Sequence, residues 1–307
     1  MIASMSSSPS LLISVKGLLL SMRPHQWTKN LVVFAALIFD IKLLQPQAAL
    51  PVLLGFAVLC LLSSAVYLIN DCVDVEADRA HPRKSGRPIA AGIVPIPVAA
   101  TAALVLIGAS LTIAFSTNIT FGVIALLYLA LTSSYSFYLK HIVVLDVIVL
   151  SLGFVLRVAA GAALVQAENF SPWLYLCMSL LALLLGFGKR RQELVELGER
   201  STTRRILREY NLPLLDQIIS IVTGALLVAY MMYSFSGAKL PTDHSFMLTI
   251  PAVVYGVFRY LYLVHVKGEG GAPDELVLRD RPLQIALAAW AAIAVALLYV
   301  VPHGGSR

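Results

Sequence analysis

The densest group of acidic side chains in the sequence directly follows an apolar run ending in Tyr67-Leu68-Ile69. The group presents four oxygen-bearing side chains, those of Asn70, Asp71, Asp74 and Asp78. At about 100° of rotation per helical residue they fall at roughly 0°, 100°, 40° and 80°, so they share one stripe of a helix. Three carboxylates on one stripe repel each other and need a cation. Hard oxygen ligands suit Mg²⁺, which keeps waters and bridges carboxylates to substrate phosphates, so the pattern predicts a magnesium site formed by these four residues.

Basic residues follow this stripe at Arg83, Lys84 and Arg87, in a segment that Pro82 and Gly86 keep from continuing the helix. Arginine suits phosphate oxygens because its planar guanidinium donates two parallel hydrogen bonds. A metal on one side and these cations on the other would hold a pyrophosphate group. The alternative is a solvated acidic helix end whose charges pair with Arg79 and Arg83.

A second charged cluster, Gly188-Lys189-Arg190-Arg191-Gln192-Glu193, comes later in the chain. Lys189, Arg190, Glu193 and Glu196 share a helix face about 120° wide, which could contact phosphate and ligate a metal through water. The alternative is an exposed helix stabilised by pairs four residues apart. Tyr210, shortly before the next apolar run, is a further candidate for substrate binding.

The elements that must position these clusters are membrane-spanning helices. The chain has 307 residues, of which 59% are hydrophobic and only 13% charged, whereas soluble proteins average about 25% charged. We predict a polytopic all-α membrane protein, since about 20 apolar residues span a bilayer. Nine spans fit the apolar runs, near residues 28–44, 48–69, 96–115, 119–139, 142–164, 172–188, 212–236, 246–266 and 282–301.

Lysine and arginine predict the orientation of these spans. Eighteen lie in the segments at one side and three at the other, which by the positive-inside rule makes the N-terminus cytoplasmic and the clusters cytosol-facing. Nucleic acid is not an expected partner, because the basic residues are scattered over short loops. The predicted organisation is a disordered or interfacial segment 1–20, one transmembrane domain 21–302 and a short tail 303–307.

Two arginines, Arg157 and Arg259, fall inside predicted spans. An intramembrane arginine costs at least about 2.5 kcal/mol without a partner, so each could face a polar cavity and an anionic substrate. The alternative is that their side chains reach toward the membrane interface.

Several stretches resemble one family. The run Asn70-Asp71-x-x-Asp74-x-x-x-Asp78 after a membrane helix is similar to the UbiA superfamily of intramembrane prenyltransferases. The chain most resembles the superfamily's decaprenyl-phosphate phosphoribosyltransferase (decaprenylphosphoryl-5-phosphoribose synthase) branch. The residues that carry this resemblance are Arg23-Pro24-His25-Gln26-Trp27-Thr28-Lys29-Asn30, Arg87-Pro88-Ile89-Ala90-Ala91-Gly92, Gly188-Lys189-Arg190 and Leu278-Arg279-Asp280-Arg281. Lys189 to Glu193 occupies the place of the second aspartate motif of typical aromatic prenyltransferases.

The resemblance implies a UbiA-like bundle of nine transmembrane helices in the cell membrane. It implies Mg²⁺-dependent transfer of 5-phosphoribose from phosphoribosyl pyrophosphate to a polyprenyl (decaprenyl) phosphate. The candidate catalytic residues are Asp74, Asp78, Lys189 and Glu193. The candidate substrate-binding residues are Arg23, Lys29, Asn70, Arg83, Lys84, Arg87, Arg157, Arg190, Tyr210 and Arg259. The candidate metal ligands are Asn70, Asp71, Asp74 and Asp78.

Two other functions stay open on the sequence. The same carboxylates could hold a prenyl pyrophosphate for transfer to an aromatic or quinone-type acceptor. A transporter could use Arg157 and Arg259 as pathway residues, although the sequence shows no internal repeat. A homo-oligomer is possible, but no residue pattern indicates an interface.

Overall fold

The computed structural model describes residues 11–81, 84–167, 171–197, 205–237, 239–271 and 273–300. Within these ranges the regular structure is entirely helical, and eight helical segments are long and apolar enough to cross a membrane. They contain α3 (Pro46–Val73), α5 (Ile96–Thr117), α6 (Ile119–Phe137), α7 (Leu145–Val165), α8 (Pro172–Leu197), α9 (Leu212–Ser236), α10 (Ile250–Tyr262) with its flanking turns η5 (Ser245–Thr249) and η6 (Leu263–Lys267), and α12 (Arg281–Val295) with η7 (Ala296–Val300). The shorter helices are α1 (Leu11–Ser21), η1 (Pro24–Phe34), α2 (Ala35–Phe39), α4 (Val75–Ala80), η2 (Leu139–His141), η4 (Arg205–Glu209) and α11 (Pro273–Arg279).

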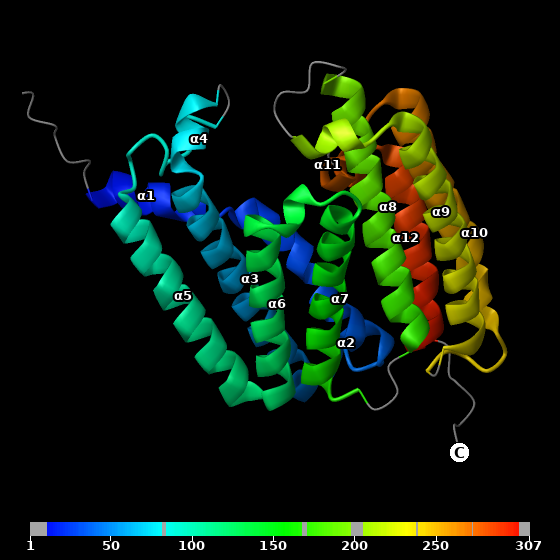
Figure 1. The fold of residues 1–307 in the computed structure, drawn as a ribbon. Helices are drawn as coiled ribbons and strands as arrows, with labels where there is room; N and C mark the ends of the chain where they lie inside the picture. The colour runs from blue at the N-terminus through cyan, green and yellow to red at the C-terminus, as the bar shows by residue number, and fades with distance from the viewer. Residues whose placement is uncertain are drawn as a thin grey trace, which may run out of the picture.

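The long helices run side by side as one bundle (Figure 1). Their outer faces carry exposed apolar side chains, for example Leu104 at 69%, Ile221 at 63% and Ile285 at 68% exposure. Water would not tolerate so much contiguous apolar surface, but lipid does. Eight of the nine predicted spans therefore correspond to observed helices, and the chain is a multi-pass membrane protein.

The span predicted at residues 28–44 is not one regular α-helix. It consists of the eleven-residue 3₁₀-helix η1 followed by the short α-helix α2. Rises of about 2.0 and 1.5 Å per residue give these two pieces a combined length of roughly 30 Å, close to the thickness of a bilayer core. The chain therefore passes from one end of the bundle to the other without one continuous α-helix.

Side-chain bonds to α3 account for the 3₁₀ geometry of η1. Residues three apart eclipse in a 3₁₀-helix, which aligns Trp27, Asn30 and Val33. Trp27 Nε1 donates to Ser64 Oγ at 3.0 Å. Asn30 Nδ2 donates to Ser63 Oγ at 3.4 Å. An α-helix would turn these anchors progressively away from α3, so the bonds across the interface outweigh the better backbone geometry that an α-helix offers.

The two ends of the bundle carry different charges. The Asp71–Asp78 stripe and the second cluster lie at one end, where α3 and α8 finish. At the other end Lys42 and Lys239 both pair with the buried Asp40, and the Lys42 ammonium also donates to the Val165 carbonyl at 3.1 Å. The described segments thus separate the basic residues into the two groups that the orientation argument used. The orientation relative to the cytoplasm stays a prediction.

The sequence predicts separate segments at the two chain ends, residues 1–20 and 303–307. Residues 1–10 and the tail 303–307 lie outside the described residues. Residues Leu11–Ser21 form the helix α1, which lies across the end of the bundle that carries the carboxylate stripe (Figure 1). Val15, Leu19 and Leu20 of α1 are about half exposed, at 49%, 53% and 59%, as in a helix at a membrane interface.

The close contact between η1 and α7 gives a prediction about stability. A Cβ at Gly161 would lie 2.0 Å from the Val33 carbonyl oxygen, so Gly161→Ala must push the two elements apart. We expect a loss of about 1–3 kcal/mol, seen as a lower melting temperature in detergent. Gly108→Ala, where a Cβ meets nothing within 4 Å, is the control and should not lower the melting temperature. Equal melting temperatures for the two variants would contradict this packing.

Candidate active site

The carboxylate stripe lies at the junction of α3 and α4. Helix α3 ends at Val73, and Asp74 has φ −86° and ψ 9°. The Asp78 amide nevertheless donates to the Asp74 carbonyl at 2.8 Å, so the helical path continues through the junction. Asp71 and Asp78 therefore stay on one side, as the helical spacing predicts.

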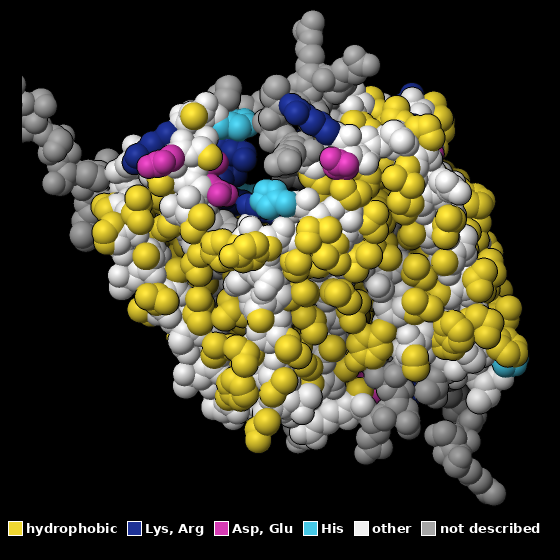
Figure 2. All heavy atoms as spheres, viewed as in Figure 1, with side chains coloured by type: hydrophobic (Ala, Val, Ile, Leu, Met, Phe, Trp, Pro, Cys, Tyr) yellow, Lys and Arg dark blue, Asp and Glu magenta, His cyan; other side chains and the backbone are white. Residues whose placement is uncertain are grey.

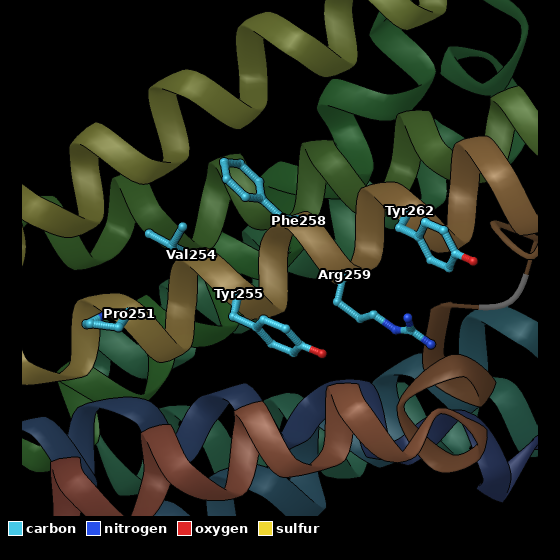
Figure 3. A pocket seen from close by; sticks show the side chains of 6 residues that line it. All are labelled: Pro251, Val254, Tyr255, Phe258, Arg259 and Tyr262. Carbon is cyan, nitrogen blue, oxygen red and sulfur yellow. The ribbon is translucent and has the colours of Figure 1, made fainter.

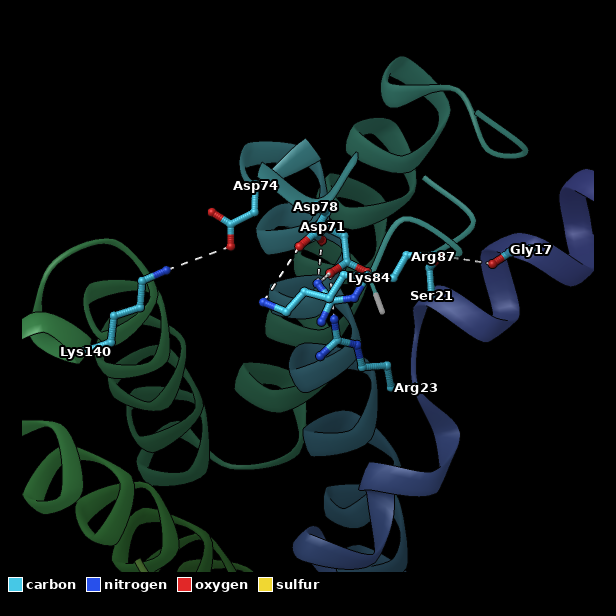
Figure 4. A network of polar contacts seen from close by, with 9 residues as sticks. All are labelled: Gly17, Ser21, Arg23, Asp71, Asp74, Asp78, Lys84, Arg87 and Lys140. Atoms are coloured by element: carbon cyan, nitrogen blue, oxygen red, sulfur yellow. Dashed lines mark hydrogen bonds and ion pairs between the residues drawn. The ribbon is translucent and has the colours of Figure 1, made fainter. Parts of the chain in front are cut away.

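Two arginines from distant segments neutralise the buried pair Asp71 and Asp78, which are 3% and 2% exposed (Figure 4). Arg23 Nη2 lies 2.6 Å from Asp71 Oδ1. Arg87 Nη1 lies 3.1 Å from the same oxygen and 2.5 Å from Asp78 Oδ2. Asp71 and Asp78 are therefore not part of a solvated helix end, because they are buried and each is paired with an arginine from another segment.

Two lysines lie at longer range. Asp74 is 44% exposed in its side chain, and Lys140 Nζ is 3.9 Å from its Oδ2 (Figure 4). Lys84 Nζ is 3.9 Å from Asp78 Oδ1. Such exposed pairs contribute little to stability, so these lysines are available to a ligand. Lys140 was not among the site residues predicted from the sequence, yet its place directly after the predicted span 119–139 could have marked it.

The second cluster is built around a carboxylate that the sequence reading missed. Asp146, at the start of α7, is fully buried and accepts from Arg190 Nε at 2.7 Å and from the Tyr210 hydroxyl at 2.8 Å. Arg190 Nη1 also donates to Glu193 Oε2 at 2.6 Å. An aspartate within the mostly apolar run 142–164 was the available signal, since burial of an unpaired carboxylate is costly.

Tyr210 connects this cluster to the backbone. The Val144 amide donates to the Tyr210 hydroxyl oxygen at 2.6 Å. Burial raises the pKa of Tyr210, so the hydroxyl stays protonated and donates to Asp146. Glu193 thus lies with Arg190 and Tyr210, whereas Lys189 of the same predicted face is exposed.

Arg157 lies deep between three elements and is only 9% exposed. Its Nε donates to Asn30 Oδ1 at 2.6 Å, its Nη1 to the Gly153 carbonyl at 2.9 Å and its Nη2 to the Tyr128 hydroxyl at 2.7 Å. Its guanidinium carbon is 4.7 Å from the centroid of the Tyr128 ring. Arg157 therefore points into the bundle rather than toward the membrane interface.

Arg259 lies elsewhere, on the outer face of α10 (Figure 3). It pairs bidentately with Asp280, at 3.1 and 2.7 Å, and the hydrogen bond from Arg259 holds the pKa of Asp280 below its usual range. The open groove beside it, of about 510 Å³, is lined by Pro251, Val254, Tyr255, Phe258, Arg259 and Tyr262. The structure thus does not bring Arg259 to the carboxylates, and Arg157 and Arg259 do not line one pathway.

The remaining candidates are placed as follows. Asn70 is half-buried on α3, and Lys29 is half-buried on η1. Arg83 lies outside the described residues.

A space-filling view locates the charges. Figure 2 shows the molecule hollowed at the end where α4 and α8 rise, with basic, acidic and histidine side chains around the hollow. The flanks in the same view are almost entirely hydrophobic or uncharged. Most of the charged side chains visible in this view gather at this end of the bundle.

The donor set fits a magnesium ion bound partly by substrate. Among the described residues no group of three or more His, Cys, Asp or Glu side chains is placed to hold a metal. The oxygens of Asp71 and Asp78 already share one cationic nitrogen of Arg87. Mg²⁺ commonly takes one or two carboxylates and completes its shell with waters and phosphates. Two buried carboxylates facing a common cation meet that requirement.

Comparison with known proteins identifies the family. The model of the UbiA prenyltransferase family matches residues 31–273. The chain belongs to the UbiA prenyltransferase family. This range contains the carboxylate stripe, Arg157 and the second cluster, while Arg23 precedes it.

Two curated relatives that match nearly the whole of this UbiA-family chain carry the same activity name. A decaprenyl-phosphate phosphoribosyltransferase of Mycolicibacterium smegmatis is 36% identical over 93% of this chain and 93% of its own. A protein of the same name from Corynebacterium glutamicum is 33% identical over 93% of this chain and 88% of its own. The predicted branch is thereby supported, and the chain is a transferase.

Solved structures confirm the UbiA fold. A UbiA homolog from Archaeoglobus fulgidus bound to GPP and Mg²⁺ has a TM-score of 0.70 and covers 92% of this chain and 100% of its own. At 18% identity this likeness concerns the fold alone.

The Tyr210 hydroxyl gives a second prediction. Tyr210→Phe leaves the Val144 amide and one bond of buried Asp146 without a partner, at a cost of about 1–3 kcal/mol. We expect a lower melting temperature in detergent. Tyr255→Phe, which alters a ring that is 51% exposed on α10, should leave the melting temperature unchanged. A Tyr210→Phe protein as stable as the wild type would show that the network is not needed for folding.

Proposed function

We propose that this UbiA-family transferase moves 5-phosphoribose from phosphoribosyl pyrophosphate to a polyprenyl phosphate, with Mg²⁺ as cofactor. The observation that carries the proposal is the similarity over 93% of the chain to decaprenyl-phosphate phosphoribosyltransferases. The cation-rich site agrees with it, because both of these substrates are strongly anionic.

Asp71 and Asp78 are the residues we assign to the metal, with Asp74 and Asn70 beside them on the same stripe. A bound Mg²⁺ would neutralise the charge that grows on the pyrophosphate as the ribose C1–O bond breaks. Asp71 and Asp78 are buried, so water screens their charges little. Their attraction for a metal ion is correspondingly strong.

Arg23 and Arg87 have a double role in this proposal. Without substrate they neutralise Asp71 and Asp78. When another cation occupies the carboxylates, both guanidinium groups are released to bind phosphate oxygens, a contact that their fork geometry favours. Lys84 and Lys140, at 3.9 Å from their carboxylates, extend the same cationic surface.

The acceptor requires positioning rather than deprotonation. A lipid phosphate is already an anion at neutral pH, and its attack on C1 of an oxocarbenium-like ribose depends on alignment. The Arg190–Asp146–Glu193 group, held rigidly by Tyr210, would fix the phosphate-binding side opposite the carboxylates. Lys189, exposed next to it, is the flexible cation of that side.

The proposed reaction takes place at the cytoplasmic face. The bundle end that carries the carboxylates also carries the segments in which 18 of the 23 lysines and arginines lie, an excess that marks the cytoplasmic side. The relatives' names support a decaprenyl chain on the acceptor.

Turnover in vesicles tests both the reaction and the orientation. Inverted vesicles containing the protein, given Mg²⁺, labelled phosphoribosyl pyrophosphate and polyprenyl phosphate, should move label into the organic phase. EDTA should abolish the transfer, and sealed right-side-out vesicles should show none because the donor cannot cross the membrane. Prenylation of an aromatic acceptor from prenyl pyrophosphate, without phosphoribose transfer, would replace this function with the alternative one.

Asp74→Asn tests the metal role of the stripe. We expect turnover to fall by about 100-fold or more at saturating Mg²⁺, because removal of charge stabilisation at a leaving group costs about 2.7–4 kcal/mol. Glu76→Gln is the matched control: Glu76 is exposed, two residues further on, and its loss should leave turnover within about twofold. Normal turnover in a folded Asp74→Asn protein would remove Asp74 from the metal site.

A further inference from the structure

The described part of the chain contains one deeply buried cation without an acidic partner, Arg157. Its three hydrogen bonds go to neutral groups, and no ion pair among the described residues includes it. The other buried arginine among the described residues, Arg190, forms an ion pair with the carboxylate of Asp146. A cation inside a membrane bundle is costly without a counter-charge, so its retention points to a ligand that supplies one.

A polar stripe on α3 connects Arg157 to the carboxylate site. Asp71, Tyr67, Ser64, Ser63 and Cys60 recur at helical spacing on the face that meets η1. From Asp71 to Cys60 this stripe runs about 16 Å into the bundle, at 1.5 Å per residue. Hydrophobic side chains would be the default on a buried helix face at this depth. Here Ser63 and Cys60 accept from Asn30, which in turn accepts from Arg157, so the stripe joins Arg157 to the carboxylate end through polar contacts.

Tyr67 lies between the two cationic positions. The Arg23 guanidinium carbon is 4.7 Å from the centroid of the Tyr67 ring, and Tyr67 is also within electrostatic range of Arg157 and Tyr128. Arg23 and Arg157 thus both lie near the ring of Tyr67. These two cationic centres can contact two charged groups of the bound substrates.

The surroundings of Arg157 hold its guanidinium in one orientation. Asn30 turns its amide oxygen to Arg157 Nε and its amide nitrogen to Cys60 and Ser63. Three of the five N–H donors of Arg157 are engaged, one on each nitrogen. One donor on each Nη remains, which is the arrangement that a phosphate accepts bidentately.

We propose that Arg157, positioned by Asn30 and Tyr128, is a second anion subsite that binds a phosphate monoester. This rests on the proposed function, in which the Asp71–Asp78 end takes the pyrophosphate through a metal. The Arg157 subsite has no carboxylate and binds its phosphate without a metal. A phosphate monoester carries close to two negative charges at neutral pH and supplies the missing counter-charge.

Two substrates of the proposed reaction contain such a group. One is the 5-phosphate of the phosphoribosyl donor, and the other is the monophosphate of the lipid acceptor. A prenyl pyrophosphate donor has no phosphate monoester besides its pyrophosphate, so Arg157 would distinguish phosphoribosyl from prenyl donors if it binds the 5-phosphate. If it binds the lipid monophosphate, it would distinguish a phosphate acceptor from an aromatic one.

Binding by the detergent-solubilised full chain tests the subsite. The probes are ribose 5-phosphate, a short-chain prenyl monophosphate and pyrophosphate with Mg²⁺, each titrated calorimetrically into wild type, Arg157→Gln and Arg157→Lys. We expect Arg157→Gln to weaken one of the two monoesters by about tenfold or more, as loss of a charge-assisted pair implies, and magnesium pyrophosphate by less than about twofold. Arg157→Lys should recover part of the loss, because it keeps the charge without the fork.

The outcomes show which substrate supplies the phosphate, and they distinguish failure of the subsite from failure of the proposed function. Weaker ribose 5-phosphate binding and a raised KM for the donor assign the subsite to the donor. Weaker prenyl monophosphate binding and a raised KM for the lipid assign it to the acceptor. Unchanged affinity for both monoesters, or an equal loss for pyrophosphate, overturns the subsite. Failure of the proposed function would instead appear as no phosphoribose transfer by wild type, while these titrations still decide the role of Arg157.

Two further variants control for an effect of the substitution on folding. Arg279→Gln removes an exposed arginine that pairs only with Glu275 four residues away and should leave all three affinities unchanged. If Arg157→Gln does not fold, Tyr128→Phe keeps the charge but removes one orienting bond. It should weaken one of the two monoesters severalfold, and unchanged affinity for both would again overturn the subsite.

Discussion

The structure depends on the compensation of charges that are buried inside an apolar bundle. Asp71 and Asp78 are only 3% and 2% exposed, so they require cations, and a buried ion pair is tolerable only with good geometry on both sides. The cations come from chain segments on either side of α3, at Arg23 and Arg87. The charge requirement therefore brings the α1–η1 junction and the loop after α4 together over one end of α3. The same rule joins α7 to α8 through Asp146 and Arg190.

These two charge clusters enclose the hollow from opposite sides. The α6–α7 connection lies between them, since Lys140 faces Asp74 on one side and Asp146 faces Arg190 on the other. The clusters differ in character. The first pairs each carboxylate with replaceable, partly exposed cations, whereas the second is closed by buried hydrogen bonds. The first is suited to exchange partners when substrate arrives, and the second is suited to hold its shape while that happens.

Helical spacing was enough to predict the stripe of Asp71 and Asp78, because both residues lie on one continuous helical path. Hydropathy was enough to predict eight of the spans. Contacts between distant segments could not be predicted in this way. Nothing in the sequence near Arg23 indicates that it pairs with a carboxylate 48 residues later. Arg157 and Arg259 are both arginines inside apolar runs, and only the structure distinguishes them, because it pairs Arg259 with Asp280. The 3₁₀ geometry of η1 was also missed, since it results from bonds to α3 rather than from local propensity.

The 3₁₀ form of η1 has a consequence for how this segment can vary. Sixteen residues from Pro24 to Phe39 cover the distance for which an α-helix needs about 20. The segment is therefore just long enough to cross the bundle. Deleting or inserting one residue would rotate the remainder by about a third of a turn and shift it by about 2 Å. Trp27, Asn30 and the Val33 carbonyl could then no longer all meet their partners. Homologous chains that keep this crossing can replace its outward side chains freely, but they must preserve its length, and gaps should be absent between the positions of Arg23 and Val33.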